Sequence, residues 1–183
     1  WPARAAAIPH VSGQTPITGV PGRIVSWQDS VYLSIGRDTT NAQVLHRVDL
    51  RTNARRVIPV GRKGRGELVS VSPDGRTLLA TERDSTRALH LQMATLPQMS
   101  WTALFPVSDP DPHVSWFSDG ESFLYQDILD DSVGTPSVFK YTLRSPLPRL
   151  FMFGCQRPLV APTGDAIVCI GADTLNPGST RDL

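Results

Sequence analysis

A turn that recurs about every 45 residues constrains the fold of this chain more than any other feature of its sequence. The clearest copy is Ser72-Pro73-Asp74-Gly75, which has a short apolar run on either side. Related turns occupy residues 117–120 (Phe-Ser-Asp-Gly) and 161–164 (Ala-Pro-Thr-Gly), and a degenerate copy precedes them at 27–30. From turn to turn the interval is 45 residues twice and then 44. Self-similarity at such a period indicates a repeat architecture.

Each of the first three repeats contains four short β-rich segments separated by Gly, Pro, Asp, Ser or Asn clusters. The last repeat contains fewer such segments. Four antiparallel strands in about 45 residues is typical of a propeller blade. We therefore predict an all-β, propeller-like array of about four four-stranded blades, the last one incomplete. The expected division is an N-terminal arm at 1–21 and an array at 22–183, with blades at about 22–62, 66–106, 111–153 and 155–183.

The incomplete last repeat leaves three arrangements open. The arm at 1–21 could supply the missing outer strand and close a small ring. The array could instead be an open arc whose edge is covered by a partner, or a part of a longer propeller. An uncovered edge strand promotes aggregation, so each alternative requires something to cover it.

The charge balance of the chain argues against a nucleic-acid binder. Eighteen Lys and Arg stand against 17 Asp and Glu, which gives a net charge of +1. A nucleic-acid-binding domain usually has a clustered basic excess, and none is present. No apolar run approaches the roughly 20 residues that cross a bilayer. The chain begins Trp1-Pro2 without an initiator Met, so we expect a processed or partial sequence whose signal peptide or anchor would lie upstream.

The repeats resemble the TolB-type, WD40-like bacterial β-propeller repeat. The resemblance rests on Ser72-Pro73-Asp74-Gly75-Arg76 with the apolar strand after it, on Glu82-Arg83-Asp84 and on the aliphatic run 89–91, and it covers roughly residues 22–172. The resemblance implies a propeller fold. Its members include periplasmic scaffold proteins, the propellers of prolyl-oligopeptidase-like enzymes and the sensor halves of bacterial kinases and regulators, so it does not imply one activity.

Motifs for catalysis and cofactor binding are missing from the sequence. A serine hydrolase of the α/β type would need a Gly-x-Ser-x-Gly pentapeptide, which does not occur. The glycine-rich run 61–66 precedes no helical pattern, so it does not match a nucleotide-binding loop. The four histidines lack the spacing of a metal site. We therefore predict no enzyme activity, no cofactor and no metal; a ligand-binding or metal-dependent enzyme that uses a central channel is a remaining alternative.

Charged loops provide the candidate binding residues. In a propeller the loops between second and third strands emerge on the same face as the loops between blades, and such rigidly held loops often carry function. The basic region lies at residues 62–65, and the acidic region comprises the aspartates between residues 109 and 131. A tryptophan in the N-terminal arm is a further candidate interface anchor. The predicted docking residues are Arg62, Lys63, Arg65, Asp109, Asp111, Asp127, Asp130, Asp131 and Trp1. Mixed charge of this kind orients a protein partner.

Cys155 and Cys169 lie almost symmetrically about the turn of the last repeat. In a hairpin centred on that turn they would lie nearly opposite each other on one side of the sheet. This placement fits a cross-strand disulfide and, equally, two buried thiols. A disulfide would fit an oxidising compartment.

These observations lead to one functional prediction and one alternative. We predict a non-catalytic scaffold or interaction subunit, periplasmic or otherwise extracytoplasmic, at the periphery of a membrane-associated complex. Its partners would be other protein subunits, without nucleic acid and without a transmembrane segment in this chain. The alternative is a sensory or regulatory propeller detached from a larger kinase, transcription regulator or peptidase.

Overall fold

The computed structural model describes residues 23–28, 31–60, 66–129, 133–172 and 180–181. These residues form strands and turns, without a helix, in four separate antiparallel sheets. The prediction of an all-β, propeller-like array whose last blade is incomplete is confirmed.

The strands follow one another across each sheet in chain order. The first sheet contains β1 (Arg23–Gln28), β2 (Val31–Arg37), β3 (Gln43–Asp49) and β4 (Ala54–Pro59). The second contains β5 (Gly66–Val71), β6 (Thr77–Arg83), β7 (Leu89–Thr95) and β8 (Trp101–Pro106). The third contains β9 (Ser115–Trp116), β10 (Ser122–Ile128), β11 (Pro136–Thr142) and β12 (Arg149–Phe153). The fourth contains β13 (Cys155–Val160), β14 (Ile167–Ala172) and the two-residue β15 (Thr180–Arg181).

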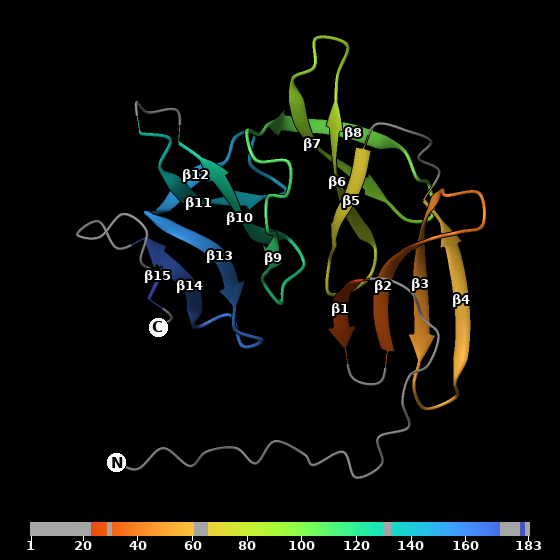
Figure 1. The fold of residues 1–183 in the computed structure, drawn as a ribbon. Coiled ribbons are helices and arrows are strands. Elements are labelled where there is room, and N and C mark those ends of the chain that lie inside the picture. Colours follow the sequence, from red (N-terminus) through yellow and green to blue (C-terminus); the bar gives the residue numbers. More distant parts are fainter. Residues whose placement is uncertain (1–22, 29–30, 61–65, 130–132, 173–179, 182–183) are drawn as a thin grey trace, which may run out of the picture.

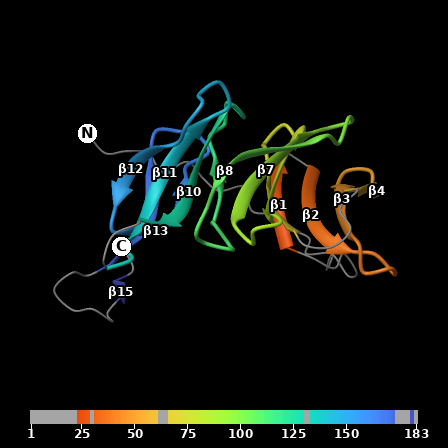
Figure 2. The ribbon, with the colours of Figure 1, turned by 90° about the horizontal axis from the view of Figure 1, so that it is seen from above.

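The four sheets are arranged around an arc (Figure 1). The first strand of each sheet lies on the inner side of the arc, and the later strands lie progressively further out. Seen from above, the sheets stand side by side, as blades do (Figure 2). The arm predicted at 1–21 lies outside the described residues.

The recurrent turn is stabilised by its own side chains. Ser72 Oγ donates to Asp74 Oδ1 at 2.5 Å and accepts a hydrogen bond from the Thr77 amide at 2.8 Å. The same Asp74 oxygen accepts from the Arg76 amide at 3.0 Å. Gly75 has a φ of +71°, a conformation that costs glycine little. These contacts make the turn a tight connection between the first two strands of its sheet.

A separate apolar core lies between each pair of consecutive sheets. The core between the first and second sheets consists of Leu33, Leu45, Val60, Leu68, Val71, Leu78 and Ala80. The core between the second and third consists of Val69, Leu79, Leu89, Leu91, Phe105, Val107, Phe123, Tyr125 and Tyr141. The core between the third and fourth consists of Leu124, Val138, Cys155 and Val160. Complete burial of one such Leu or Phe side chain contributes about 1.5–3 kcal/mol, so the sheets stabilise one another. None of these cores joins the first and fourth sheets within the described part of the chain.

The inner strands β5 and β13 contain bulges and also form hydrogen bonds to the preceding sheet. β5 has a register shift between Leu68 and Ser70, and the Leu68 amide donates to Oε1 of Gln43 in the preceding sheet at 3.0 Å. β13 has a similar shift, and its Val160 amide donates to Oγ of Ser115 in the preceding sheet at 2.9 Å. β5 and β13 are the first strands of their sheets, so amides on the edge away from the second strand have no strand partner, and here a side chain of the neighbouring blade accepts one of them.

Candidate docking face

Two hairpin loops at corresponding positions of the first and second sheets have the same sequence pattern. Residues 37–42 and 83–88 both read Arg-Asp-x-Thr-x-Ala and join the second strand of their sheet to the third. Both loops lie at the upper ends of their strands in Figure 1. The aspartate is the centre of each loop, since short polar side chains in turns hydrogen-bond to nearby backbone amides.

The hydrogen bonds of the two loops are alike, bond for bond. In the first loop, Asp38 Oδ1 accepts from the amide of Thr40 at 2.8 Å, the hydroxyl of Thr40 at 2.7 Å and the amide of Ala42 at 3.0 Å. In the second, Asp84 Oδ1 accepts from the corresponding groups of Thr86 and Ala88 at the same three distances. One carboxylate oxygen therefore fixes each loop.

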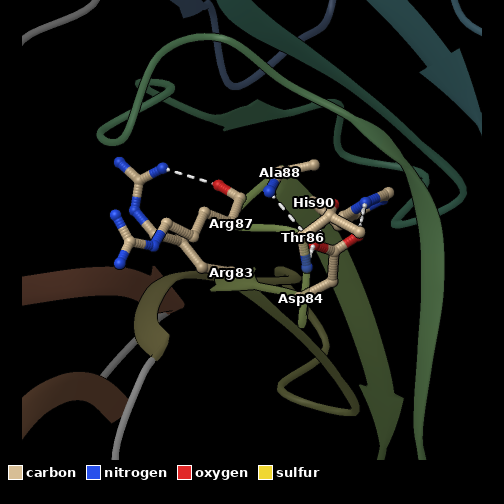
Figure 3. A network of polar contacts seen from close by, with 6 residues as sticks. All are labelled: Arg83, Asp84, Thr86, Arg87, Ala88 and His90. Carbon is tan, nitrogen blue, oxygen red and sulfur yellow. Dashed lines mark hydrogen bonds and ion pairs between the residues drawn. The ribbon is translucent and has the colours of Figure 1, made fainter.

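An arginine completes each loop from the other side. The Arg37 guanidinium donates to the carbonyl oxygen of Asn41, and that of Arg83 donates to the carbonyl oxygen of Arg87, both at 3.0 Å. Asn41 and Arg87 have φ values of +64° and +71°, so both carbonyls lie in a left-handed turn. In Figure 3 the Arg83 and Arg87 side chains extend together, away from the Asp84 carboxylate. Each loop is thus a rigid, charged hairpin.

The hydrogen bonds lower the pKa of both loop aspartates. For Asp38 the largest cause is the hydroxyl of Thr40, and for Asp84 it is the hydroxyl of Thr86. In the second loop His90 Nε2 also lies 3.1 Å from Asp84 Oδ2. Hydrogen bonds to the charged form favour that form, so both loops carry an ionised carboxylate over a wide pH range.

Three of the predicted acidic docking residues lie close together, but they differ in exposure. Asp127 is only 8% exposed, and its Oδ1 accepts hydrogen bonds from the amides of Ser108 and Asp109 at 2.8 and 3.0 Å and from its neighbour Ile128. It therefore anchors the connection between the second and third sheets. Asp109 is half-buried and Asp111 is exposed, so these two present charge at the surface of that connection.

A polar chain extends from this connection to the fourth sheet. The side-chain amide of Gln126 donates to Asp109 Oδ2 at 2.8 Å, and its oxygen accepts from the Arg157 amide at 2.9 Å. His113 Nε2 lies 3.9 Å from Asp111 Oδ2. Within the described residues no group of three or more His, Cys, Asp or Glu side chains could hold a metal ion. The arrangement fixes loops in space, which suits recognition of a partner.

The remaining predicted docking residues lie outside the described residues. Trp1 belongs to the arm, Arg62, Lys63 and Arg65 belong to the connection between β4 and β5, and Asp130 and Asp131 belong to the loop between β10 and β11.

Cys155 and Cys169 form a disulfide across the β13–β14 hairpin, with their Cα atoms 6.0 Å apart. The register differs from the nearly opposite placement expected from the sequence, because Cys155 pairs with Gly171. The hairpin is centred between residues 163 and 164, since Val160 pairs with Ile167, and without the bulge in β13 Cys155 would pair with Ala172. The bulge brings Cys155 opposite Gly171, two residues from Cys169, so the bridge joins diagonal neighbours on the same face of the sheet.

Sequence reasoning missed the two Arg-Asp-x-Thr-x-Ala loops as ordered, charged hairpins. Their signal is present in the sequence, since the pattern occurs twice, 46 residues apart.

Within the described part of the chain there is also no helix of the length and hydropathy needed to span a membrane.

Comparison with known proteins shows the fold and no closer relationship. No family model matches the chain, and no curated protein matches it. The chain is similar in structure to TolB from Acinetobacter baumannii, with a TM-score of 0.63 and 20% sequence identity over 86% of the chain. It is also similar to a protein assigned as TolB from Agrobacterium tumefaciens, with a TM-score of 0.59 and 17% identity over 88% of the chain.

A prolyl endopeptidase shares the fold as well, with a TM-score of 0.56 and 12% identity over 84% of the chain. The chain spans 39% and 57% of the two TolB proteins and 26% of the endopeptidase. The similarity therefore concerns a part of each of those longer chains, and TolB and peptidase propellers both share it.

Proposed function

From its TolB-type propeller fold, we propose that this protein is a non-catalytic subunit that binds other proteins through the loops at one end of its blades. The observation that supports this proposal most directly is the repeated hydrogen-bond network of the loops at 37–42 and 83–88. Loops held in one conformation lose little conformational entropy when a partner binds, which favours recognition.

Charge at this end of the blades would orient the partner. Arg83 and Arg87 extend from one loop, Asp109 and Asp111 lie on the next connection, and the β4–β5 connection carries Arg62, Lys63 and Arg65. Complementary charge increases the rate and the specificity of association more than its strength. In this proposal Asp130, Asp131 and Trp1 extend the same interface, and Asp127 positions its acidic part.

We place the protein outside the cytoplasm, as a peripheral structural component of a membrane-associated complex. The Cys155–Cys169 disulfide supports this location, because such bonds persist in the periplasm and at cell surfaces and are rare in the cytosol. The resemblance of the repeats to those of periplasmic scaffold proteins supports it further. The arm at 1–21 is proposed to cover the incomplete last blade.

The test is gentle purification of the protein from its native source, followed by size measurement and identification of bound subunits. We expect the wild type to travel with larger, membrane-extracted subunits. A triple charge reversal, Arg62→Glu with Lys63→Glu and Arg65→Glu, should release them or weaken their binding at least about tenfold.

The matched control is Arg51→Glu with Arg55→Glu and Arg76→Glu. It changes the net charge equally, and its three residues are exposed. Arg51 and Arg76 lie in turns at the opposite end of the blades, and Arg55 lies on the outer strand β4. The control should retain the partners. Release by both variants would indicate a general charge effect, and retention by both would contradict the proposed loop interface.

A second function is favoured by the similarity to a prolyl endopeptidase propeller. In that case the chain would be a sensory or regulatory propeller detached from a larger kinase, transcription regulator or peptidase. The mass of the native polypeptide distinguishes the two, since this second function requires a catalytic or membrane domain on the same polypeptide as these repeats.

A further inference from the structure

The outer strand of the third sheet exposes an apolar surface. Phe153 is 60% exposed, Leu147 is 67% exposed, and Leu150 and Phe151 are exposed as well. β12 is the last strand of its sheet, and within the described residues no strand pairs with its outer edge. We call these four side chains, together with Lys140 and Arg149, the β12 patch. The patch covers both faces of the strand edge, because Leu150 and Phe153 pair with Phe139 and Ser137 on one face, whereas Arg149 pairs with Lys140 on the other. Contiguous exposed apolar side chains of this kind usually mark an interaction site.

The outer strands β4 and β8 are less suited than β12 to pairing with a further strand. β4 carries Arg55 and Arg56 and ends in a proline, and β8 also ends in a proline. Charged side chains and prolines on an edge strand discourage the pairing of a further strand. β12 has one charged residue, Arg149, at its start, and the remainder of the strand is apolar.

A pocket of about 470 Å³ lies within the patch. Leu147, Leu150 and Phe151 supply its apolar wall, and Lys140 and Arg149 supply its charge. Two hydroxyl side chains complete the lining, and no carboxylate contributes to it. An apolar pocket with a few charged groups at its border is the common form of an anchor site for a partner side chain.

The two cations of the pocket lie directly opposite each other. Lys140 on β11 is the register partner of Arg149 on β12. Like charges in this position repel each other across a sheet. The Lys140 ammonium lies 4.4 Å from the centroid of the Phe117 ring, whereas the Arg149 guanidinium has no ion-pair partner among the described residues. A carboxylate between them would relieve the repulsion.

We propose that the β12 patch binds an extended segment of another protein in which apolar and acidic residues alternate. The segment adds as a strand to the free edge of β12, and its main chain hydrogen-bonds to that edge. Its side chains alternate between the two faces of the sheet: the apolar ones lie beside Leu150 and Phe153, and the acidic ones lie at the pocket. An acidic side chain lies beside Arg149 and Lys140. This site is separate from the loops at the blade ends, so it goes beyond the function proposed above.

The probe is a capped nine-residue peptide in which Val and Phe alternate with Glu, labelled at one end and titrated with the full protein by fluorescence anisotropy. Binding is expected with a Kd below about 1 mM, and it should weaken as salt is raised. A peptide with Lys in place of Glu should not bind. A peptide with central prolines should bind more weakly, because proline lacks the amide that pairs with a strand edge.

The variant Arg149→Glu should weaken binding of the acidic peptide at least about tenfold and strengthen binding of the lysine peptide. Arg56→Glu is the matched control, since Arg56 on β4 is the register partner of Arg47 just as Arg149 is that of Lys140. Reversal of Arg62, Lys63 and Arg65 should leave peptide binding unchanged, which separates this proposal from the loop interface.

Three results of the binding experiments would overturn the proposal. The first is absence of binding by the acidic peptide, and the second is an equal effect of Arg149→Glu and Arg56→Glu. The third is Arg149-dependent binding to phosphatidylglycerol vesicles without binding to the peptide, which would identify a lipid surface as the ligand. A Phe153→Cys variant tests whether the patch is open: rapid maleimide labelling supports the proposal, and a protected thiol in the isolated protein contradicts it.

Discussion

At the scale of the residue, one carboxylate determines the shape of each Arg-Asp-x-Thr-x-Ala loop. Asp38 and Asp84 each receive two backbone amides and one threonine hydroxyl on a single oxygen. The tight turns at the other end of the blades also depend on aspartates, at Asp74 and Asp119. The same side chain therefore shapes both ends of the blades through local hydrogen bonds.

The threonine hydroxyl should control the titration of its aspartate. In Thr86→Val the largest cause of the lowered pKa of Asp84 is removed, so this pKa should rise toward the ordinary value of an aspartate. The contribution of a depressed carboxyl to stability is present above its unfolded pKa and is lost as the pH falls through its folded pKa. The loop of the variant should therefore loosen at a higher pH than that of the wild type.

This expectation can be checked by NMR titration of the Asp84 carboxyl carbon, with Asp38 in the same sample as the internal control. The Asp38 loop retains its own hydroxyl from Thr40, so its titration should not change. An unchanged Asp84 titration in Thr86→Val would show that the backbone amides and His90 hold the carboxylate without the hydroxyl.

At the scale of the element, the turns were predictable and the bulges were not. Ser72-Pro73-Asp74-Gly75 has a fixed chemical signature, so its position and its structural role follow from sequence alone. The bulges in β5 and β13 have no such signature. The hydrogen bonds by which Gln43 and Ser115 accept backbone amides of these strands have none either, because each joins residues far apart in the chain. The diagonal placement of Cys155 and Cys169 arises because the hairpin is centred nearer to Cys169 than their symmetry about the turn suggested, and the bulge in β13 then brings both cysteines to one face.

The disulfide should contribute substantially to the stability of the fourth sheet. It closes a loop with a sequence separation of 14 residues, and a loop of this size corresponds to about 3 kcal/mol in the chain-entropy treatment. The double variant Cys155→Ala with Cys169→Ala should lower the free energy of unfolding by roughly this amount in urea titrations. Reduction of the wild type is the control and should have a similar effect; equal midpoints for oxidised, reduced and variant protein would contradict the expectation.

At the scale of the whole molecule, the repeat period predicted the architecture and could not predict how the array ends. The 45-residue spacing places four sheets in sequence, and the structure shows an apolar core between each consecutive pair. What covers the outer face of the fourth sheet depends on residues far away in the chain or on another molecule. Leu159 and Val168, which are register partners on that face, are 63% and 56% exposed. Repeats of one chain do not specify such a contact.

The difference in coverage between the sheets should appear as a difference in the protection of their backbone amides against hydrogen exchange. The second and third sheets each contact a core on both faces, and the first and fourth each contact a core on one face within the described residues. The fourth sheet also has three strands, the last of two residues, where the first sheet has four. In a repeat array, stability is the sum of each repeat and its interfaces, so the fourth sheet should open locally most readily. Native-state hydrogen exchange should show the slowest amides at Leu79 and Leu124, in the middle strands, and faster exchange at Val168. Equal protection at Val168 would show that the exposed face of the fourth sheet is covered in the native protein, and the same measurement on a chain lacking residues 1–21 would then identify whether the arm covers it.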